Sequence, residues 1–385
     1  METIKRLIPK EETSFFLFGP RGTGKTTWLE SNFPDSLYID LLDDSVYRTF
    51  LAHPEIIKEY LDAEENKSTV IIDEIQRIPS LLPLVHQQME QRQELQFILT
   101  GSSSRKLKRS GVDLLGGRAL LKRCFPFMAA EIGDGFTIQN ALTLGQVPLV
   151  LSAANPEKTL SAYITLYLKE EVQQEGLLRN IENFSRFMEA ISFSHGQVLN
   201  ISEVARESQI SRKTVEGYIH ILHDLLLSQE IPIFSKRAKR ALIKHNKFFY
   251  FDAGVYNTLR PKGPLDKPNE ISGPALEGLF LQHLQAWVEY GQRNSRIYYW
   301  RTKSGVEVDF VLYGEKDFAA FGIKNADKIR NKDLTGLKNF GDDYPEANLY
   351  FLYRGREKRK IEKVLCLPIR EFLLDMIPGR PLKEM

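Results

Sequence analysis

TSFFLFGPRGTGKTTWLE, residues 13–30, decides the fold of the first third of the chain. It begins with a short apolar run, residues 15–18, of the kind that is buried in a parallel sheet. A glycine-rich loop and a helical segment follow, with the spacing G-x-x-x-x-G-K-[ST] of a P-loop. In such a loop, successive backbone N–H groups and the positive end of the helix face phosphate oxygens. We therefore predict an α/β domain whose parallel sheet carries an ATP site.

The residues of this loop have separate predicted roles. Lys25 is expected to contact the β- and γ-phosphates as a catalytic residue, and the hydroxyl of Thr26 is expected to ligate Mg²⁺. Glycines permit the tight turn that brings the backbone close to the phosphates. The predicted nucleotide-binding residues are Gly19, Pro20, Arg21, Gly22, Thr23, Gly24, Lys25, Thr26 and Thr27.

A second acidic motif lies in STVIIDEIQRIPS, residues 68–80, where Asp73 and Glu74 follow an apolar strand. The carboxyl ends of parallel strands form the edge at which α/β folds bind ligands. We expect Asp73 to hold the magnesium ion through water and Glu74 to orient or deprotonate the attacking water as a catalytic residue. The alternative is that the two acids only mark a strand end, which the P-loop upstream disfavours.

Two later motifs are candidates for a role in the same reaction. QFILTGSSS, residues 96–104, places Thr100 or Ser102 where a hydroxyl senses the γ-phosphate, with a simple turn as the alternative. GVDLLGGRALLKRCFPF, residues 111–127, carries Arg118 and Arg123. We predict Arg118, ahead of Arg123, as an arginine finger on the nucleotide of a neighbouring subunit. A surface salt bridge is the alternative for both.

Length and composition set the wider limits. A chain of 385 residues is long for one core and predicts two or three domains. The formal net charge of +2 implies no particular partner, although basic clusters occur at 105–109, 236–240 and 356–360. The two cysteines, Cys124 and Cys366, are far apart in the sequence and have apolar neighbours. We therefore expect them to be buried thiols in a reducing compartment. With no signal-peptide pattern and no apolar run of about 18 residues, we predict a cytoplasmic protein without membrane contact.

The middle of the chain has a helical period from about residue 159 to 197, followed by the outline of a helix-turn-helix at 199–227. Ser202 is expected to cap the first helix of this motif, and Ser211 the second. Arg212 and Lys213 begin the second helix, where base or phosphate contacts are made. A strand with a basic wing follows. Helix-turn-helix shapes also serve as plain protein-interaction modules. The predicted DNA-binding residues are Arg212, Lys213, Lys236, Arg237, Lys239 and Arg240.

The last third is predicted to be a separate α/β layer. An amphipathic helix at 273–291 bears Glu277, and residues 296–325 form three alternating strands. Asp309 and Lys324 occupy two positions at which metal-dependent nucleases carry a carboxylate and a lysine, but Gly322 stands where a second strand carboxylate belongs. Glycine ligates nothing, so we predict a degenerate nuclease-like site formed by Glu277, Asp309 and Lys324, without cleavage. The alternative for Asp309 and Lys324 is a buried ion pair inherited with the fold.

The order of motifs along the chain is similar to that of a known family. The motifs are GPRGTGKTT, VIIDEIQ, FILTGSSS, GGRALLKRCFPF, YFDAGVYN, ALEGLFLQHL and VEVDFVL. Together they resemble the predicted AAA+ superfamily ATPases of bacteria and archaea. The resemblance implies an AAA+ P-loop core at 1–155, a helical lid and winged helix at 156–245, and a domain resembling the PD-(D/E)XK nuclease fold at 246–385. The C-terminal motifs are weaker than the N-terminal ones, and Gly322 departs from the nuclease pattern.

From these features we predict a DNA-associated AAA+ ATPase that acts as a homo-oligomer, such as a hexameric ring. It would couple the binding and hydrolysis of ATP with Mg²⁺ to binding or remodelling of duplex, branched or forked DNA. The alternative is a nucleotide-dependent switch that acts on a protein partner or in transcription. An active metal nuclease is the least favoured interpretation.

Overall fold

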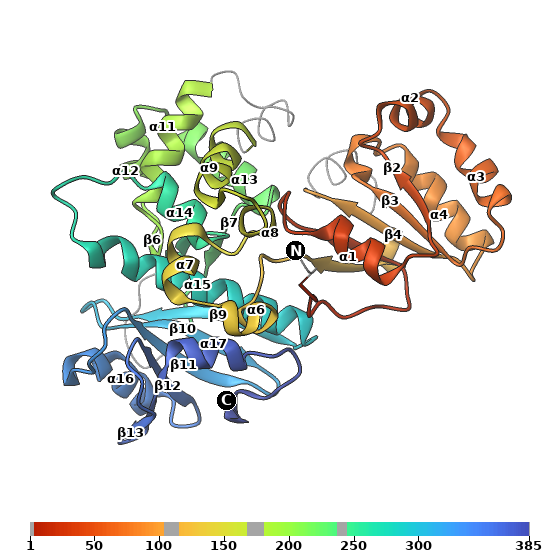
Figure 1. The fold of residues 1–385 in the computed structure, drawn as a ribbon. Helices are drawn as coiled ribbons and strands as arrows, with labels where there is room; N and C mark the ends of the chain where they lie inside the picture. The colour runs from red at the N-terminus through yellow and green to blue at the C-terminus, as the bar shows by residue number, and fades with distance from the viewer. Residues whose placement is uncertain (1–3, 104–114, 168–180, 237–244, 385) are drawn as a thin grey trace. The chain divides into compact units, whose positions relative to one another are not determined.

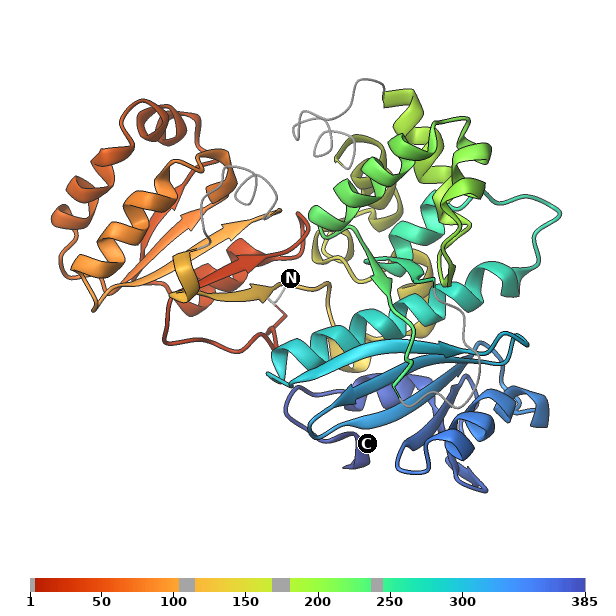
Figure 2. The same cartoon turned by 180° about the vertical axis from the view of Figure 1, so that it is seen from behind.

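The computed structural model shown in Figures 1 and 2 describes residues 4–103, 115–167, 181–236 and 245–384. Contacts between residues divide the chain into two compact units. The first unit consists of residues 8–125 with 223–226, and the second of residues 126–222 and 227–385 with the N-terminal segment up to residue 7. The three-part division at 1–155, 156–245 and 246–385 stays a prediction.

The first unit is built on a sheet of parallel strands in the order β2-β3-β4-β1-β5. Its strands are β1 (Phe15–Phe18), β2 (Leu37–Asp40), β3 (Thr69–Asp73), β4 (Gln96–Gly101) and β5 (Leu120–Arg123). Its helices are α1 (Lys25–Asn32), α2 (Asp44–Ala52), α3 (Ile57–Ala63) and α4 (Leu81–Gln91), with 3-10 turns η1 (Pro54–Ile56), η2 (Ile75–Arg77) and η3 (Leu115–Gly117). The predicted parallel sheet of a P-loop domain is confirmed.

Both faces of this sheet are covered, which explains why its central strands are apolar throughout. Strand residues alternate between faces, so Phe16 and Phe18 enter the core cluster on one face, with Phe50 of α2 among their neighbours. Phe15 points to the other face and meets Trp28 of α1 edge-on, with ring centroids 6.3 Å apart. An all-parallel sheet needs this cover because both of its faces are apolar.

The second unit begins with helices around a small antiparallel sheet, β6-β8-β7. Its strands are β6 (Gln197–Val198), β7 (Ser228–Ile231) and β8 (Lys247–Tyr250). Its helices are α6 (Ala129–Ile132), α7 (Ile138–Leu144), α8 (Pro148–Leu151), α9 (Pro156–Ala162), α11 (Ile181–Ser192), α12 (Ile201–Ser208), α13 (Arg212–Asp224), α14 (Ala253–Leu259) and α15 (Pro268–Tyr290), with a 3-10 turn η4 (Gly133–Gly135) and a π turn η5 (Tyr163–Tyr167).

Helices α12 and α13 coincide with the predicted helix-turn-helix, with one correction. The first helix starts two residues earlier than expected, because the side chain of Asn200, and not Ser202, accepts the Glu203 N–H as the N-cap. Ser211 is positioned as predicted and accepts the Thr214 N–H at 3.2 Å. Strands β7 and β8 follow α13 as an antiparallel pair.

A mixed sheet in the order β13-β14-β12-β11-β10-β9 completes the second unit. Its strands are β9 (Ser295–Arg301), β10 (Glu307–Gly314), β11 (Phe318–Lys324), β12 (Asn348–Tyr353), β13 (Arg359–Ile361) and β14 (Val364–Pro368). Helices α16 (Thr335–Asp343) and α17 (Ile369–Asp375) and the 3-10 turns η6 (Asn331–Leu334) and η7 (Leu382–Glu384) complete it. Phe280 of α15 contacts rings on β10, β11 and α17, so α15 and α17 cover one face (Figure 1). Phe340 of α16 belongs to the core on the other face.

The segment after β7 joins the two sheets of this unit. The Phe234 N–H donates to the Tyr299 carbonyl at 2.7 Å, and the Tyr299 N–H donates to the Pro232 carbonyl at 3.0 Å. Residues 232–234 therefore extend the six-stranded sheet beyond β9. The buried ring of Phe234 contacts the rings of Tyr313 and Phe318, among others.

The motif YFDAG, residues 250–254, is explained by one buried carboxylate. Asp252 caps α14, accepting the N–H of Gly254 at 2.9 Å and of Val255 at 3.1 Å, and it accepts the Gln146 N–H at 2.7 Å. The side chain thereby joins α14 to the end of α7. Burial raises the pKa of Asp252 to about 6, and the three N–H donors only partly oppose that rise.

This shift predicts a pH-dependent contribution of Asp252 to stability. The native carboxyl holds its proton above the unfolded pKa, so its contribution is complete below about pH 4 and is lost as the pH rises through about 6. Asp252→Asn stays neutral at every pH. The free energy of unfolding of the wild type should therefore fall relative to this variant by on the order of 3 kcal/mol between pH 4 and pH 7, at about 1.4 kcal/mol per pKa unit.

The measurement is urea unfolding in a Trp28→Phe background, in which the remaining tryptophans, Trp287 and Trp300, both report on the second unit. A difference between wild type and Asp252→Asn that stays constant from pH 4 to pH 7 would contradict the assignment.

Candidate functional site

The P-loop connects β1 to α1 as a tight turn. Gly22 and Gly24 have φ angles of 79° and 84°, in the left-handed region that glycine adopts without strain, and Gly24 caps α1. The Thr23 hydroxyl donates to the Pro20 carbonyl at 2.7 Å. Lys25 is buried, and its Nζ donates to the Gly19 carbonyl at 2.8 Å. The predicted phosphate-binding lysine therefore lies against the loop whose backbone would meet the phosphates.

The first glycine of the loop is held between two strand ends. The Gly19 N–H donates to the Gly101 carbonyl at the end of β4, at 3.2 Å. A Cβ atom on Gly19 would lie 2.5 Å from the carbonyl oxygen of Cys124, just after β5. Any larger residue would push the loop away from the sheet. Cys124 itself is a buried thiol outside any disulfide, as predicted, and its Sγ donates to the Thr23 carbonyl at 3.2 Å.

Asp73 at the end of β3 is the centre of the site. Its Oδ2 accepts the Thr26 hydroxyl at 3.0 Å and the Tyr38 hydroxyl at 2.6 Å, and its Oδ1 accepts the Thr100 hydroxyl. The structure thus brings together the two residues predicted to serve magnesium, Thr26 and Asp73. Tyr38 on β2 was missed because no motif marks it. Burial, with the neighbouring charge of Asp73, raises the pKa of Tyr38.

Glu74 leaves the strand with an unusual backbone. Its φ of 58° lies in the left-handed region, which costs a non-glycine residue about 1 kcal/mol or more. Residues in this conformation are found most often at functional sites. The Glu74 N–H donates to the Thr100 hydroxyl at 3.1 Å, so one threonine contacts both acidic residues. Gln76 donates its side-chain amide to the Glu74 carboxylate.

The donor set fits Mg²⁺ and the phosphates of ATP. A threonine hydroxyl and a carboxylate are hard oxygen donors, and Mg²⁺ typically takes few protein oxygens when substrate phosphates supply others. Thr26 and Asp73 are already within hydrogen-bond distance of each other. Thr26 lies in the first turn of α1, whose N-terminus favours negative charge.

The two candidate arginines lie at opposite ends of β5. In the parallel register with β1, Arg123 is level with Phe18 beside the P-loop, and Arg118 precedes Leu120, which is level with Phe15 at the far edge of the sheet. Arg118 donates to Glu90 at 2.8 Å, and its side chain is 47% exposed. The strand direction therefore separates Arg118 from the P-loop of its own unit.

The predicted DNA contacts are only partly described. Arg212 and Lys213 are exposed at the start of α13, where Arg212 also pairs with Glu216 at 3.0 Å on the same helix. Lys236 is exposed and lies over the ring of Tyr313, 4.2 Å from its centroid. The other predicted contacts lie outside the described residues: Arg237, Lys239 and Arg240.

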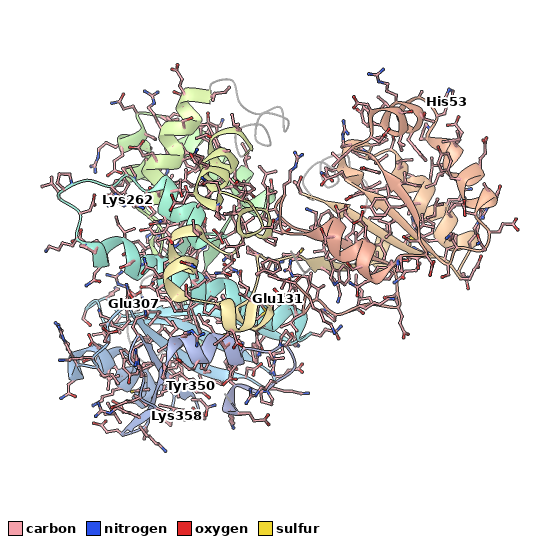
Figure 3. All side chains as sticks on the ribbon, viewed as in Figure 1. His53, Glu131, Lys262, Glu307, Tyr350 and Lys358 are labelled. Atoms are coloured by element: carbon pink, nitrogen blue, oxygen red, sulfur yellow. The ribbon has the colours of Figure 1, made fainter. Side chains whose placement is uncertain are left out.

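In the C-terminal part, which was predicted to be nuclease-like, a buried lysine lies among the acids. Lys247 of β8 is 2% exposed, and its Nζ lies 3.8 Å from Glu277 Oε2 and contacts Glu307 Oε1. Glu307, labelled in Figure 3, also meets Arg301 at 3.4 Å. Asp309 Oδ2 accepts the Ile323 N–H at 2.6 Å. We call Lys247, Glu277, Glu307 and Asp309 the Lys247 cluster; neither Lys247 nor Glu307 was singled out from the sequence.

The charges in the Lys247 cluster depend on one another. Burial raises the pKa of Glu277 well above its ordinary value, and the nearby Asp309 adds to this. Burial also raises the pKa of Asp309 to about 6, although Lys247 opposes the rise. For Lys247, burial lowers the pKa, but the three carboxylates outweigh it and the pKa is raised. The positive charge of Lys247 thus offsets part of the desolvation cost of burying these acids.

Lys324 forms its ion pair outside the Lys247 cluster, although its charge slightly opposes the rise in the pKa of Glu277 and of Asp309. The Lys324 side chain is 53% exposed and its Nζ lies 4.0 Å from Asp333, so the alternative of a buried Asp309–Lys324 ion pair is wrong. A Cβ atom on Gly322 would lie 3.2 Å from Leu337 and 3.3 Å from Phe351, in the apolar core. Within the described parts of the chain, no three His, Cys, Asp or Glu side chains are arranged to hold a metal ion.

Three family models match successive parts of the chain. Residues 11–133 match the AAA domain, residues 135–266 match a domain of unknown function (DUF8612), and residues 272–372 match another (DUF4143). Over these first residues the chain is similar to an AAA domain. The match agrees with the predicted P-loop AAA domain, whereas ATP hydrolysis, the winged helix and the nuclease-like fold stay predictions.

Curated relatives and solved structures give more distant matches. The uncharacterized protein Rv2008c of Mycobacterium tuberculosis and the uncharacterized protein Mb2031c of Mycobacterium bovis are each 25% identical over 368 residues, covering 93% of this chain and 80% of theirs. AMPPCP-bound DnaA from Aquifex aeolicus aligns with 13% identity and a TM-score of 0.27, over 55% of this chain and 82% of its own. C. elegans PCH-2 aligns with 14% identity and a TM-score of 0.25, over 54% and 61%. TM-scores this low do not establish a shared fold. In the described parts of the chain, no helix is long and apolar enough to cross a membrane.

The Lys247 cluster generates a stability prediction. Lys247→Met should lower the free energy of unfolding of the second unit by about 3–5 kcal/mol, because it leaves buried carboxylates without their counter-charge. Lys338→Met is the matched control, since its pair with the exposed Glu362 contributes about 1 kcal/mol or less. Adding Glu277→Gln and Glu307→Gln to Lys247→Met should recover much of the loss. Equal effects of the two lysine substitutions in urea unfolding would refute the role given to Lys247.

Proposed function

We propose that the protein is a Mg²⁺-dependent ATP hydrolase whose ATP site is the P-loop edge of the first unit. The observation that carries this proposal is the 3.0 Å hydrogen bond from the Thr26 hydroxyl to Asp73. It joins the helix that would receive the phosphates to the strand that bears the acidic motif. The match of residues 11–133 to the AAA domain supports the same conclusion.

Each residue then has one task. Lys25 offsets the charge that develops on the transferred phosphoryl group, and the loop amides bind the phosphates. Thr26 and Asp73 would hold Mg²⁺, which neutralises phosphate charge when bound. Glu74 orients the attacking water and accepts its proton. Thr100 contacts both Asp73 and the Glu74 backbone, and so keeps the two acids in one arrangement.

We further propose that the second unit binds DNA and that the protein works as a homo-oligomer. Helices α12 and α13, the antiparallel pair β7–β8 and the exposed Arg212 and Lys213 support a helix-turn-helix contact with duplex or branched DNA. The position of Arg118 at the far edge of its own sheet supports action on the nucleotide of a neighbouring subunit. The Lys247 cluster supports a role in binding rather than cleavage, because its carboxylates already have a resident cation.

The ATPase proposal predicts separable effects of two substitutions. Lys25→Ala should abolish turnover and weaken ATP binding, because it removes the positive charge at the phosphates. Glu74→Gln should retain ATP binding and lose hydrolysis, because only the activation of water is affected. Phosphate release and the binding of a fluorescent ATP analogue measure the two properties.

Lys10→Ala is the matched control, since Lys10 Nζ donates to the Asn32 carbonyl at the other end of α1. It should leave both properties unchanged. Hydrolysis by Lys25→Ala and Glu74→Gln at the rate of the wild type would show that the site is misassigned.

The DNA proposal predicts salt-dependent binding that weakens on loss of Arg212 or Lys213. Each lost phosphate contact should reduce the slope of log affinity against log salt by about 1. Fluorescence anisotropy with duplex and forked DNA measures this, and Lys10→Ala in the first unit is the control for loss of an exposed lysine. An affinity that changes with neither salt nor these substitutions, together with ATP turnover that responds only to a protein partner, would favour the protein-switch alternative.

The same DNA should remain uncut in Mg²⁺ or Mn²⁺. Labelled duplex, single-stranded and forked DNA are the substrates for this assay. Cleavage that is lost in Asp309→Ala but kept in Lys25→Ala would overturn the assignment of a binding role to the C-terminal part.

A further inference from the structure

Gln76 is a buried polar residue beside the proposed ATP site. The proposed mechanism assigns no role to it. It lies in the turn η2, two residues after Glu74, and is 6% exposed. Its side-chain Nε2 donates to Glu74 Oε2 and, at 3.2 Å, to the Ser102 hydroxyl. A side-chain amide has two N–H donors, so both contacts can be made at once.

The other side of the Gln76 amide lies against the end of β4. A Cβ atom on Gly101 would lie 2.3 Å from Gln76 Oε1, so the amide occupies the space next to the backbone of this glycine. The Gly101 carbonyl accepts the Gly19 N–H, the first residue of the P-loop. The amide of Gln76 therefore stands between the Glu74 carboxylate and the strand end that contacts the P-loop.

The side-chain carbonyl oxygen of Gln76 argues against a purely structural role for this residue. Gln76 Oε1 is buried and accepts no hydrogen bond from any described residue. An unsatisfied buried acceptor costs about 1–3 kcal/mol, so an apolar side chain of similar size would suit folding better. Glutamine differs from such an apolar residue by the N–H donors of its amide group. These donors contact Glu74 and Ser102.

We propose that Gln76 is a positioning residue for ATP hydrolysis, which holds the Glu74 carboxylate in one orientation and ties it to Ser102 at the end of β4. This inference rests on the proposed ATPase function. Holding Oε2 determines the direction in which Oε1 of the same carboxylate faces, and a general base must meet the water within hydrogen-bond distance. The left-handed backbone of Glu74 sets the position of the residue, and Gln76 sets the orientation of its side chain.

Gln76→Met is the variant that tests this, because methionine has a similar size and shape and no amide. It should lower kcat about 10- to 100-fold, the usual effect of losing an orienting partner, with little change in the affinity for ATP. A hydrogen bond donated to a carboxylate favours its charged form, so its loss should also move the acid limb of the kcat–pH profile to higher pH. Gln76→Glu should move the limb further, because it places a like charge next to Glu74.

Gln88→Met is the matched control. Gln88 is a buried glutamine of the same unit, and its amide contacts Gln91 on the same helix, α4. It should leave kcat and the pH profile as in the wild type. A purely structural role for Gln76 would instead lower the melting temperature and leave the acid limb in place, and this outcome overturns the inference.

The outcome can be separated from that of the ATPase proposal. If the wild type hydrolyses ATP and Lys25→Ala does not, while Gln76→Met keeps the kcat and acid limb of the wild type, only the inference about Gln76 fails. If the wild type does not hydrolyse ATP, the contact itself is tested by NMR on protein labelled with ¹⁵N-glutamine. The side-chain amide signal that disappears in Gln76→Met should shift as Glu74 titrates, and Glu74→Gln should abolish that shift. An amide signal that does not respond overturns the inference whatever the activity.

Discussion

The P-loop edge of the first unit depends on one buried carboxylate. Asp73 accepts three hydroxyl groups, one each from α1, β2 and β4, donated by Thr26, Tyr38 and Thr100. A carboxylate removed from water must be hydrogen-bonded, since leaving it unpaired costs several kcal/mol. This requirement holds the strand that bears Asp73 against the first turn of the P-loop helix and against both neighbouring strands. The positions of Lys25 and Glu74 relative to each other follow from that arrangement.

Buried carboxylates also need partners in the second unit, but there the partner is a cation. There Lys247 supplies the counter-charge for Glu277 and Glu307, and Arg301 pairs with Glu307 from the exposed side. In the Lys247 cluster, Glu307 is thus paired within the protein, whereas Glu277 Oε2 lies 3.8 Å from the ammonium group and accepts no hydrogen bond from the described residues. In the first unit, hydroxyl donors satisfy Asp73 and add no positive charge, which leaves its negative charge available to a cation. Whether a buried acid is paired with hydroxyls or with an ammonium group decides what it can bind.

More of the candidate site could be predicted from the sequence in the first unit than in the second, for a physical reason. The P-loop and the acid pair at 73–74 are local patterns, in which chain direction and residue type together define the chemistry, so they could be recognised from short stretches. Tyr38 and Lys247 belong to no such pattern, and Gln76, although it ends the motif VIIDEIQ, was assigned no role from the sequence. Tyr38 is 35 residues from its partner Asp73, and Lys247 is 60 residues, 307 minus 247, from Glu307. Strand order within one sheet brings Tyr38 to Asp73, and the arrangement of two separate sheets brings Lys247 to Glu307.

By itself, the sequence determined that the first third is a P-loop α/β domain, because a buried strand, a glycine loop and a helix that begins at Lys25 admit few other arrangements. It also determined that Gly322 supplies no carboxylate. Only the tertiary structure decided which residues hold the acids in place. Hydrogen bonds and ion pairs form between side chains that the fold brings within about 3–4 Å of each other, whatever their separation along the chain. The sequence therefore identified Asp73, Glu277 and Asp309 but not Glu307, and the packing of the sheets decided which acids face hydroxyl groups and which face a lysine.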